Sequence, residues 1–272
     1  MHDFKFKEKY DVNDLVEIMK ILRGENGCPW DREQDHKSIR KNFLEETYEV
    51  LEAIDAEDAS LLREELGDVL LQVVFHSQME AEKGVFDFSD VADEVCKKLI
   101  ERHPHVFGEI SVENSGEVLK NWDNIKQASK GQETYTDTLK SVPKILPALM
   151  KSYKIGQRAK RAGMDFKSEL DAFEALESEV GELKKALDGK CRSEIEDELG
   201  DVLFSAVNVA RKLEIDPEEC LSKACEKFIK RFAETENLIR PQGIDMKTLG
   251  IDELDVYWRL AKQKLAEKNK GQ

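Results

Sequence analysis

The second half of this chain repeats the first, and that repeat limits the fold more than any other feature of the sequence. Glu46 aligns with Glu179 and Glu65 aligns with Glu198, at the same shift of 133 residues. This shift places the run Glu65-Leu66-Gly67-Asp68-Val69 on Glu198-Leu199-Gly200-Asp201-Val202. With small gaps, Lys98, Arg102, Trp122 and Lys126 align with Lys227, Arg231, Trp258 and Lys262. A repeat of this kind predicts two units of the same architecture.

Apolar residues recur every three or four positions along almost the whole chain, which is the period of an amphipathic helix. Only 6 Pro and 15 Gly interrupt the 272 residues, and 36% of the residues are charged. That composition favours helices over strands. The sequence therefore predicts an all-α fold, with helices near residues 13–23, 36–55, 60–82, 89–102, 116–129, 146–161, 169–187, 194–213, 217–237 and 252–269.

A polar segment of weak periodicity, residues 127–143, separates the two sets of helices. We therefore predict an N-terminal domain at 1–126, a linker at 127–145 and a C-terminal domain at 146–272. Two helix starts have the spacing of capping boxes, Ser168-x-x-Asp171 and Ser193-x-x-Glu196. A third start is predicted at Asp216, an N-cap residue that precedes a proline at the first helical position.

The charge and the cysteine pattern exclude several classes of protein. The net charge of -15 repels nucleic-acid backbones, so we expect no nucleic-acid partner. No apolar stretch approaches the roughly 18 residues that a membrane helix needs, and the N-terminus has no apolar signal core, so we predict a cytoplasmic protein without a membrane partner. The 5 Cys form no C-x-x-C pair, which argues against a disulfide framework or a zinc site.

Each half carries Glu-x-x-Glu, then fifteen residues, then Glu-x-x-Asp. The first quartet is Glu46, Glu49, Glu65 and Asp68, and the second is Glu179, Glu182, Glu198 and Asp201. A spacing of three places each pair on one face of a helix. Residue 190 is the midpoint between Glu182 and Glu198 and also between Glu179 and Asp201. Asp188-Gly189-Lys190 supplies turn-forming residues there. An antiparallel helical hairpin would therefore bring the four carboxylates of each half together.

Such a cluster is unfavourable without a counterion, because two like charges about 4 Å apart repel by about 4 kcal/mol at an effective dielectric of 20. Carboxylate oxygens are the ligands that hard divalent cations prefer. We therefore predict that the second quartet binds a hard divalent cation, Mg2+, Mn2+ or Ca2+, and that the first quartet forms a second site. A single Glu-x-x-Glu pair is most often a solvated helix face. The duplicated, turn-matched arrangement beside apolar residues favours a metal site instead.

Two pairs of residues in the second half have the spacing to hold a nucleotide. Lys227 and Arg231 are four apart on a predicted helix and can both face the oxygens of a phosphate. Trp258 and Lys262 form a second such pair, in which the indole could stack on a base. Their counterparts in the first half are Lys98, Arg102, Trp122 and Lys126. Taken alone, each pair is better explained as surface cations or a core tryptophan, and the neighbouring acidic quartet is what favours a nucleotide site. No glycine-rich phosphate loop occurs, so helices would have to hold any nucleotide.

The sequence motifs together resemble the MazG family of nucleoside triphosphate pyrophosphohydrolases. The resemblance covers essentially the whole chain and is carried by GCPWDREQDHKS, NFLEETYEVLEAI, REELGDVLLQVVFHS, RHPHVFG, GMDF, ELGDVLF and EKFIKRF. It implies tandem all-α domains that assemble four-helix bundles, commonly as a homodimer. It also implies that NTPs and dNTPs of broad base specificity are cut between the α- and β-phosphates, giving a nucleoside monophosphate and pyrophosphate. By the same resemblance, the C-terminal domain is the main catalytic candidate.

The resemblance assigns a role to each of the residues singled out above. It implies that Glu179, Glu182, Glu198 and Asp201 bind Mg2+ and carry catalysis, and that Lys227, Arg231, Trp258 and Lys262 contact the nucleotide. Our mechanistic hypothesis is that Glu182 orients or deprotonates a water that attacks the α-phosphorus. Two alternatives stay open from the residues alone. One is a di-iron carboxylate bundle, although no histidine stands three residues after a glutamate of either quartet. The other is a non-catalytic nucleotide sensor or scaffold.

Overall fold

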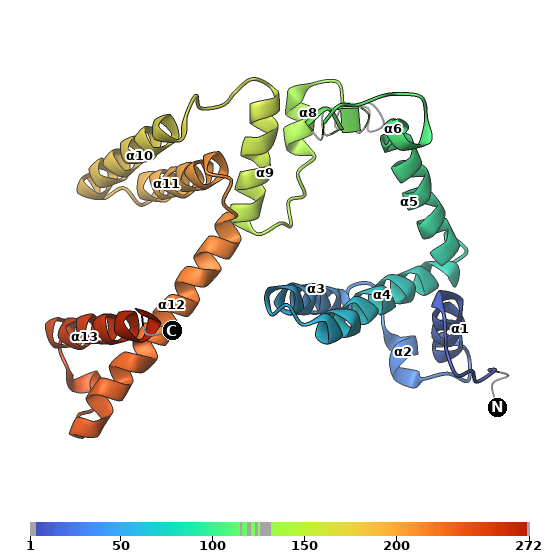
Figure 1. Ribbon diagram of the computed structural model, residues 1–272, viewed down its shortest axis with the longest axis horizontal. Coiled ribbons are helices and arrows are strands. Elements are labelled where there is room, and N and C mark those ends of the chain that lie inside the picture. The colour runs from blue at the N-terminus through green and yellow to red at the C-terminus, as the bar shows by residue number, and fades with distance from the viewer. Residues whose placement is uncertain (1–3, 115, 119–120, 123–124, 126–131, 271–272) are drawn as a thin grey trace. The chain divides into compact units, whose positions relative to one another are not determined.

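The computed structural model describes residues 4–114, 116–118, 121–122, 125 and 132–270. Every regular element within these ranges is a helix, which confirms the all-α prediction (Figure 1). The chain forms two compact units, Met1–Lys126 and Gln127–Gln272. The predicted helix at 116–129 lies mostly outside the described residues. Among the described helices, none combines the length and the apolar character that crossing a bilayer requires.

The first unit is built on a helical hairpin. Its described helices are α1 (Val12–Arg23), α2 (Pro29–Glu33), α3 (Arg40–Asp55), α4 (Ala59–Ala81), α5 (Phe88–Arg102) and α6 (Pro104–Phe107). Helices α3 and α4 pack side by side as the hairpin, and α1 packs against α4 (Figure 1). The buried core joins these elements through Met19, Ile39, Val74, Phe75 and Met79.

The segment before α3 is held as an ordered turn rather than as the helix start that the sequence predicts at residue 36. Asp35 Oδ1 accepts hydrogen bonds of 2.8 Å from the backbone N–H groups of Lys37 and Ser38, the pattern of an N-cap residue. The turn that Asp35 begins leads into α3, whose regular helix starts only at Arg40. Arg23 then fastens the segment to α4, because its guanidinium donates to the carbonyl oxygen of Gln34 at 3.1 Å and pairs with Glu82 at 2.7 Å.

Two histidines reinforce this attachment. His36 Nδ1 lies 2.7 Å from His76 Nδ1 on α4, and His36 Nε2 lies 2.5 Å from Glu80 Oε1. The two imidazole rings are stacked, with centroids 5.0 Å apart. The side chain of Trp30, in contrast, is 56% exposed. Arg23 and the histidines therefore attach this segment to α4.

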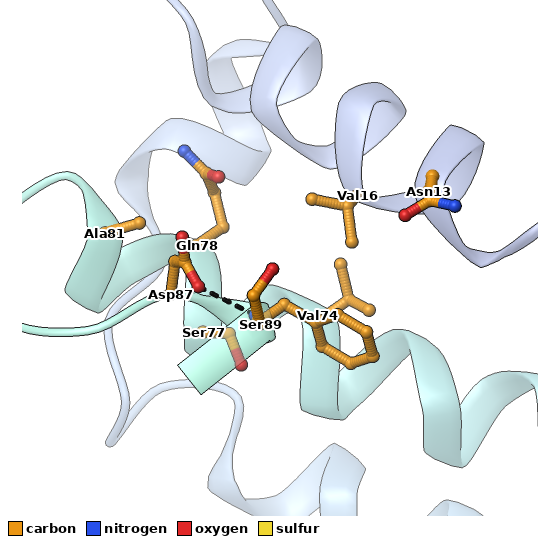
Figure 2. A pocket seen from close by; sticks show the side chains of 9 residues that line it. Asn13, Val16, Val74, Ser77, Gln78, Ala81, Asp87 and Ser89 are labelled. Carbon is orange, nitrogen blue, oxygen red and sulfur yellow. Dashed lines mark hydrogen bonds between the residues drawn. The ribbon is translucent and has the colours of Figure 1, made fainter. Parts of the chain in front are cut away.

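A small pocket lies between α1, α4 and the start of α5 (Figure 2). Its lining includes Asn13, Val16, Val74, Ser77 and Asp87, and its volume is about 110 Å³. Pockets for metabolites usually enclose at least about 300 Å³, so this one is too small for a nucleotide. It also contains none of the residues of the first quartet.

The second unit repeats the hairpin and adds a second helix pair. Its helices are α8 (Tyr135–Lys140), α9 (Ala148–Arg161), α10 (Glu169–Gly189), α11 (Arg192–Lys212), α12 (Pro217–Ile239), η1 (Arg240–Gln242), η2 (Met246–Thr248) and α13 (Ile251–Lys270). Helices α10 and α11 pack as the hairpin, α9 packs on α11, and α13 packs on α12 (Figure 1). Part of the segment predicted as a linker forms α8, whose carbonyl oxygen of Thr138 accepts a hydrogen bond from Arg158 of α9.

A buried ion pair joins the loop before α10 to the end of α11. Arg211 Nη2 lies 2.6 Å from Asp165 Oδ1, and their side chains are only 5% and 15% exposed. Asn208 holds the same guanidinium, because its Oδ1 accepts a hydrogen bond from Arg211 Nε at 3.1 Å. Gly156 of α9 leaves room for this arrangement, since a Cβ at that position would lie 2.8 Å from Arg211 Nε.

Candidate functional site

The α10–α11 hairpin positions the second acidic quartet. Ser168 begins α10 as a capping box, and Lys190 ends it in the left-handed conformation with φ of 58°. This short turn folds α11 back on α10, as the residue spacing predicts. Carboxylate oxygens of Glu179, Glu182 and Glu198 consequently lie within 4.8 Å of one another.

The α3–α4 hairpin gathers the first quartet in the same way. Asp58 begins α4 as its N-cap, and Glu57 before it takes a positive φ of 54°. Carboxylate oxygens of Glu46, Glu49 and Glu65 lie within 4.8 Å of one another. The two units therefore contain the same constellation at matching positions of the repeat.

The aspartates stand beside these groups of three glutamates rather than within them. The negative charge of Asp201 acts on Glu198, and that of Asp68 acts on Glu46 and Glu65. The convergence of four carboxylates predicted from the spacing is thus a group of three glutamates with an aspartate close enough to repel them.

Burial and mutual repulsion destabilise the ionised form of these glutamates. Burial, followed by the charges of Glu182, Asp201 and Glu179, raises the pKa of Glu198 above its usual value. In the first unit, burial, followed by the charge of Glu49, raises the pKa of Glu65. A nearby cation would offset this repulsion and favour the ionised carboxylates.

Glu198 gives a second indication that a cation belongs in the site. Its Oε2 atom is buried and has no hydrogen-bond partner among the described residues. A buried carboxylate oxygen without a donor is costly unless something satisfies it. The donor set consists of carboxylate oxygens alone, which suits hard cations such as Mg2+ and Mn2+ better than zinc. The residues of the quartet therefore fit a hard divalent cation.

The cationic and aromatic candidates of the second unit lie on the α12–α13 pair. Helix α12 carries Lys227 and Arg231, and α13 carries Trp258 and Lys262. The two lysines are exposed, whereas Arg231 and Trp258 are half-buried. The indole ring of Trp258 packs against Phe228, with ring centroids 5.0 Å apart and planes tilted by 45°. The structure thus brings these candidates onto one pair of crossing helices.

In the described part of the second unit, no ion pair joins these cations to the acidic quartet. The quartet lies on the α10–α11 hairpin, whereas α13 packs on the C-terminal half of α12, away from α11 (Figure 1). The hairpin also leaves an apolar stripe uncovered, in which Phe173, Val180, Leu187, Leu199 and Leu203 are each 47–53% exposed.

The counterparts in the first unit have different neighbours. Arg102 places its guanidinium 5.2 Å from the ring centroid of Trp122, a cation–π contact. Lys98 is exposed on α5. Lys126, the fourth predicted member of this set, lies outside the described residues.

Comparison with known proteins identifies the family. The model of the MazG nucleotide pyrophosphohydrolase domain matches residues 34–107 and again residues 167–234, together just over half of the chain. The chain belongs to the MazG family. A Thermotoga maritima relative, "Nucleoside triphosphate pyrophosphohydrolase/pyrophosphatase MazG", is 43% identical over 92% of this chain and 94% of its own length. An Escherichia coli K12 relative, "Nucleoside triphosphate pyrophosphohydrolase", is 42% identical over 93% of this chain and 97% of its own length.

The two MazG matches show how the repeat relates to the candidate sites. The match at 34–107 contains the first quartet, and the match at 167–234 contains the second quartet together with Lys227 and Arg231. Trp258 and Lys262 follow the second match. The roles predicted for these side chains remain predictions.

Sequence reasoning missed two residues of this MazG domain. Phe228 packs against Trp258, and Glu234 pairs with lysines of α13. The only signal for Glu234 was its spacing of three from Arg231, which places both on one side of α12. Neither contact could be found without knowing how α13 crosses α12.

Proposed function

We propose that this chain is a Mg2+-dependent nucleoside triphosphate pyrophosphohydrolase of broad base specificity. The proposal is that it converts NTPs and dNTPs to the corresponding monophosphates and pyrophosphate. The single observation that carries it is the convergence of Glu179, Glu182 and Glu198 within 4.8 Å, in a chain whose full-length relatives are named for this activity. Free nucleotides are cytoplasmic metabolites, so a cytoplasmic location remains our prediction.

The second quartet would hold the metal and place the reacting water. A Mg2+ held by Glu179, Glu182, Glu198 and Asp201 would neutralise the triphosphate and make a bound water more acidic. Glu182 is the exposed member of the three glutamates, so it can reach a water on the solvent side. It would orient or deprotonate that water for in-line attack on the α-phosphorus.

The α12–α13 pair would bind the rest of the nucleotide. Lys227 and Arg231 would neutralise the charge that develops on the departing pyrophosphate. Trp258 would stack on the base, which tolerates any base because each one presents a flat π face. Lys262 would contact a phosphate. The first quartet, Glu46, Glu49, Glu65 and Asp68, would act as a second metal site.

We further propose that the catalytic form is a homodimer, in which apolar stripes of two chains cover one another and complete four-helix bundles. The half-exposed side chains of α10 and α11 support this. Light scattering of the purified chain should give twice the mass of one chain. Leu187→Glu, which puts a charge into the stripe, should shift it to the single-chain mass. A parent chain that is monomeric at all concentrations contradicts the dimer.

The activity is tested by incubating the purified chain with a panel of NTPs and dNTPs, with and without Mg2+, and identifying the products. We expect pyrophosphate and monophosphate from all common bases, and none without a divalent cation. Glu182→Gln should lower kcat by roughly 10²- to 10⁴-fold, the usual contribution of a general base. Glu177→Gln is the matched control, because Glu177 is exposed on the same helix outside the cluster.

Three results would contradict the proposal. Release of orthophosphate in place of pyrophosphate would place the cut at another bond. Undiminished turnover by Glu182→Gln would remove its catalytic role. Tight nucleotide binding without any turnover would identify a sensor or scaffold instead.

A further inference from the structure

Glu234 of α12 is the most buried carboxylate of the helix pair that carries the nucleotide-binding candidates. The residue is 7% exposed, although glutamates are almost always solvated unless they are paired. Its partners come from α13: Lys264 Nζ lies 2.5 Å from Glu234 Oε1, and Lys268 Nζ lies 3.6 Å from Glu234 Oε2. Both carboxylate oxygens are therefore engaged by lysines one turn apart on the neighbouring helix.

The electrostatics agree with this geometry. The close contact with Lys264, together with the positive charges of Lys264 and Lys268, lowers the pKa of Glu234 despite the opposing effect of burial. The ionised carboxylate is thus favoured, and the contact is an ion pair across two helices. Isolated surface ion pairs contribute little, but this one has a buried partner and two cations.

The ion pair lies beside the point where α13 crosses α12. Ala261 of α13 is completely buried, and Thr235 of α12 is 1% exposed. These small side chains allow the helices to approach closely, and Trp258 packs against Phe228 on one flank of α13. Fixing the rotation of α13 about its own axis also needs a restraint on the opposite flank. Glu234 can supply that restraint because it forms ion pairs with Lys264 and Lys268 on that flank of α13.

Helical geometry connects this flank to the nucleotide-binding candidates. Successive residues of an α-helix are rotated by about 100°. Relative to Ala261, Lys264 therefore projects about 60° to one side, and Trp258 about 60° to the other. Lys262 lies on the same side as Trp258. A restraint on Lys264 and Lys268 consequently sets the direction in which Trp258 and Lys262 point.

We infer that Glu234 is a positioning residue that, through Lys264 and Lys268, sets the rotation of α13 and so presents Trp258 and Lys262 to the nucleotide. This inference rests on the proposed function, in which those two side chains contact the substrate. Glu234 itself touches neither base nor phosphate. Its loss should weaken nucleotide binding in the ground and transition states alike, which raises KM and leaves kcat nearly unchanged.

The test compares Glu234→Gln, Lys264→Met and the double variant with the parent chain. Each single change should raise KM by roughly 10-fold, the lower end of what the loss of an outer positioning group costs at metal sites. The double variant should be no worse than either single one, because both remove the same contact. Glu234→Asp keeps the charge and should restore most of the affinity. Glu236→Gln, an exposed position on the same helix, is the matched control.

A second measurement separates this inference from the proposed function. The Kd of a nucleoside triphosphate with a non-hydrolysable α–β bridge is measured for the same variants, together with hydrogen exchange of α13 in the free protein. We expect the Kd to rise in parallel with KM, and α13 to exchange faster in Glu234→Gln.

The outcomes are distinguishable. A parent chain that binds the analogue but releases no pyrophosphate contradicts the proposed function, and the Kd series still decides the role of Glu234. An active parent whose KM and Kd are unchanged by Glu234→Gln overturns the positioning role alone. A fall in kcat at constant KM overturns it as well. A parent chain that binds no nucleotide contradicts both.

Discussion

Gly156 of α9 marks the place where a single methyl group should disturb the packing of the second unit. An added Cβ would lie 2.8 Å from Arg211 Nε, 2.9 Å from Asn208 Oδ1 and 3.1 Å from Arg211 Cδ. The arginine cannot swing aside freely, because its Nη2 is held by Asp165 at 2.6 Å and its Nε by Asn208 at 3.1 Å. Gly156→Ala must therefore push α9 away from α11 or separate the ion pair.

Two opposing effects decide the change in stability. Alanine is preferred to glycine inside a helix by about 1 kcal/mol, which favours the substitution. Overpacking a tight contact costs about 1–3 kcal/mol, and breaking one side of a buried ion pair costs about 3–5 kcal/mol. The steric clash outweighs the helix preference, so we expect a net loss of about 1–3 kcal/mol in the free energy of unfolding. For a domain of this size that loss corresponds to a fall in Tm of about 2–12 °C.

Thermal unfolding followed by circular dichroism measures this change. The control is the same substitution in an Asn208→Ala/Arg211→Ala background, where both obstructing side chains are gone and only the helix preference of alanine remains. There, Gly156→Ala should stabilise the protein by up to about 1 kcal/mol. The packing argument is supported if Gly156→Ala lowers the free energy of unfolding in the parent chain and raises it in the control background. Destabilisation by the same amount in both backgrounds, or stabilisation in the parent chain, refutes it.

Two further predictions concern charge. Without divalent cations at neutral pH, Glu198→Gln should raise Tm, because it removes one of the repelling charges beside Glu182, Asp201 and Glu179. Added Mg2+ should raise the Tm of the parent chain more than that of the variant. A lower Tm for the cation-free variant than for the cation-free parent would count against the repulsion. Burial and the neighbouring His36 lower the pKa of His76, so His76 favours folding above its unfolded pKa of about 6.5 and that stabilisation is lost as the pH falls. Between about pH 7.5 and about pH 5.5 the first unit should therefore lose less stability in His76→Phe than in the parent chain, and identical losses would exclude this role for the histidine.

The helices and the hairpins were predictable because they depend on patterns that are local in sequence. Periodicity located most of the helices to within a few residues, and the repeat predicted the matched acidic groups. Ser168 and Asp216 begin their helices as expected. Ser193 does not, because α11 already starts at Arg192 and the Ser193 hydroxyl lies 3.3 Å from Cys191 Sγ.

Contacts between helices distant in sequence were not predictable. The ion pair between Arg23 and Glu82 joins the end of α1 to the end of α4, and spacing along the chain does not show that these two side chains meet. The positions of Asp68 and Asp201 beside the glutamates depend on how tightly each hairpin closes, which spacing alone does not give. Helix α8 was taken for linker because its sequence is polar, and a side chain of α9 stabilises it instead.

The pairing of helices that follow one another along the chain has a consequence for how this protein is made. The pairs α3–α4, α10–α11 and α12–α13 each close over a short connection. Loops of that length close in well under a microsecond, and topologies dominated by such local contacts reach the native state quickly. We expect each hairpin to form soon after its second helix leaves the ribosome. The acidic groups of the amino-terminal repeat would then be assembled while the carboxyl-terminal repeat is still being translated.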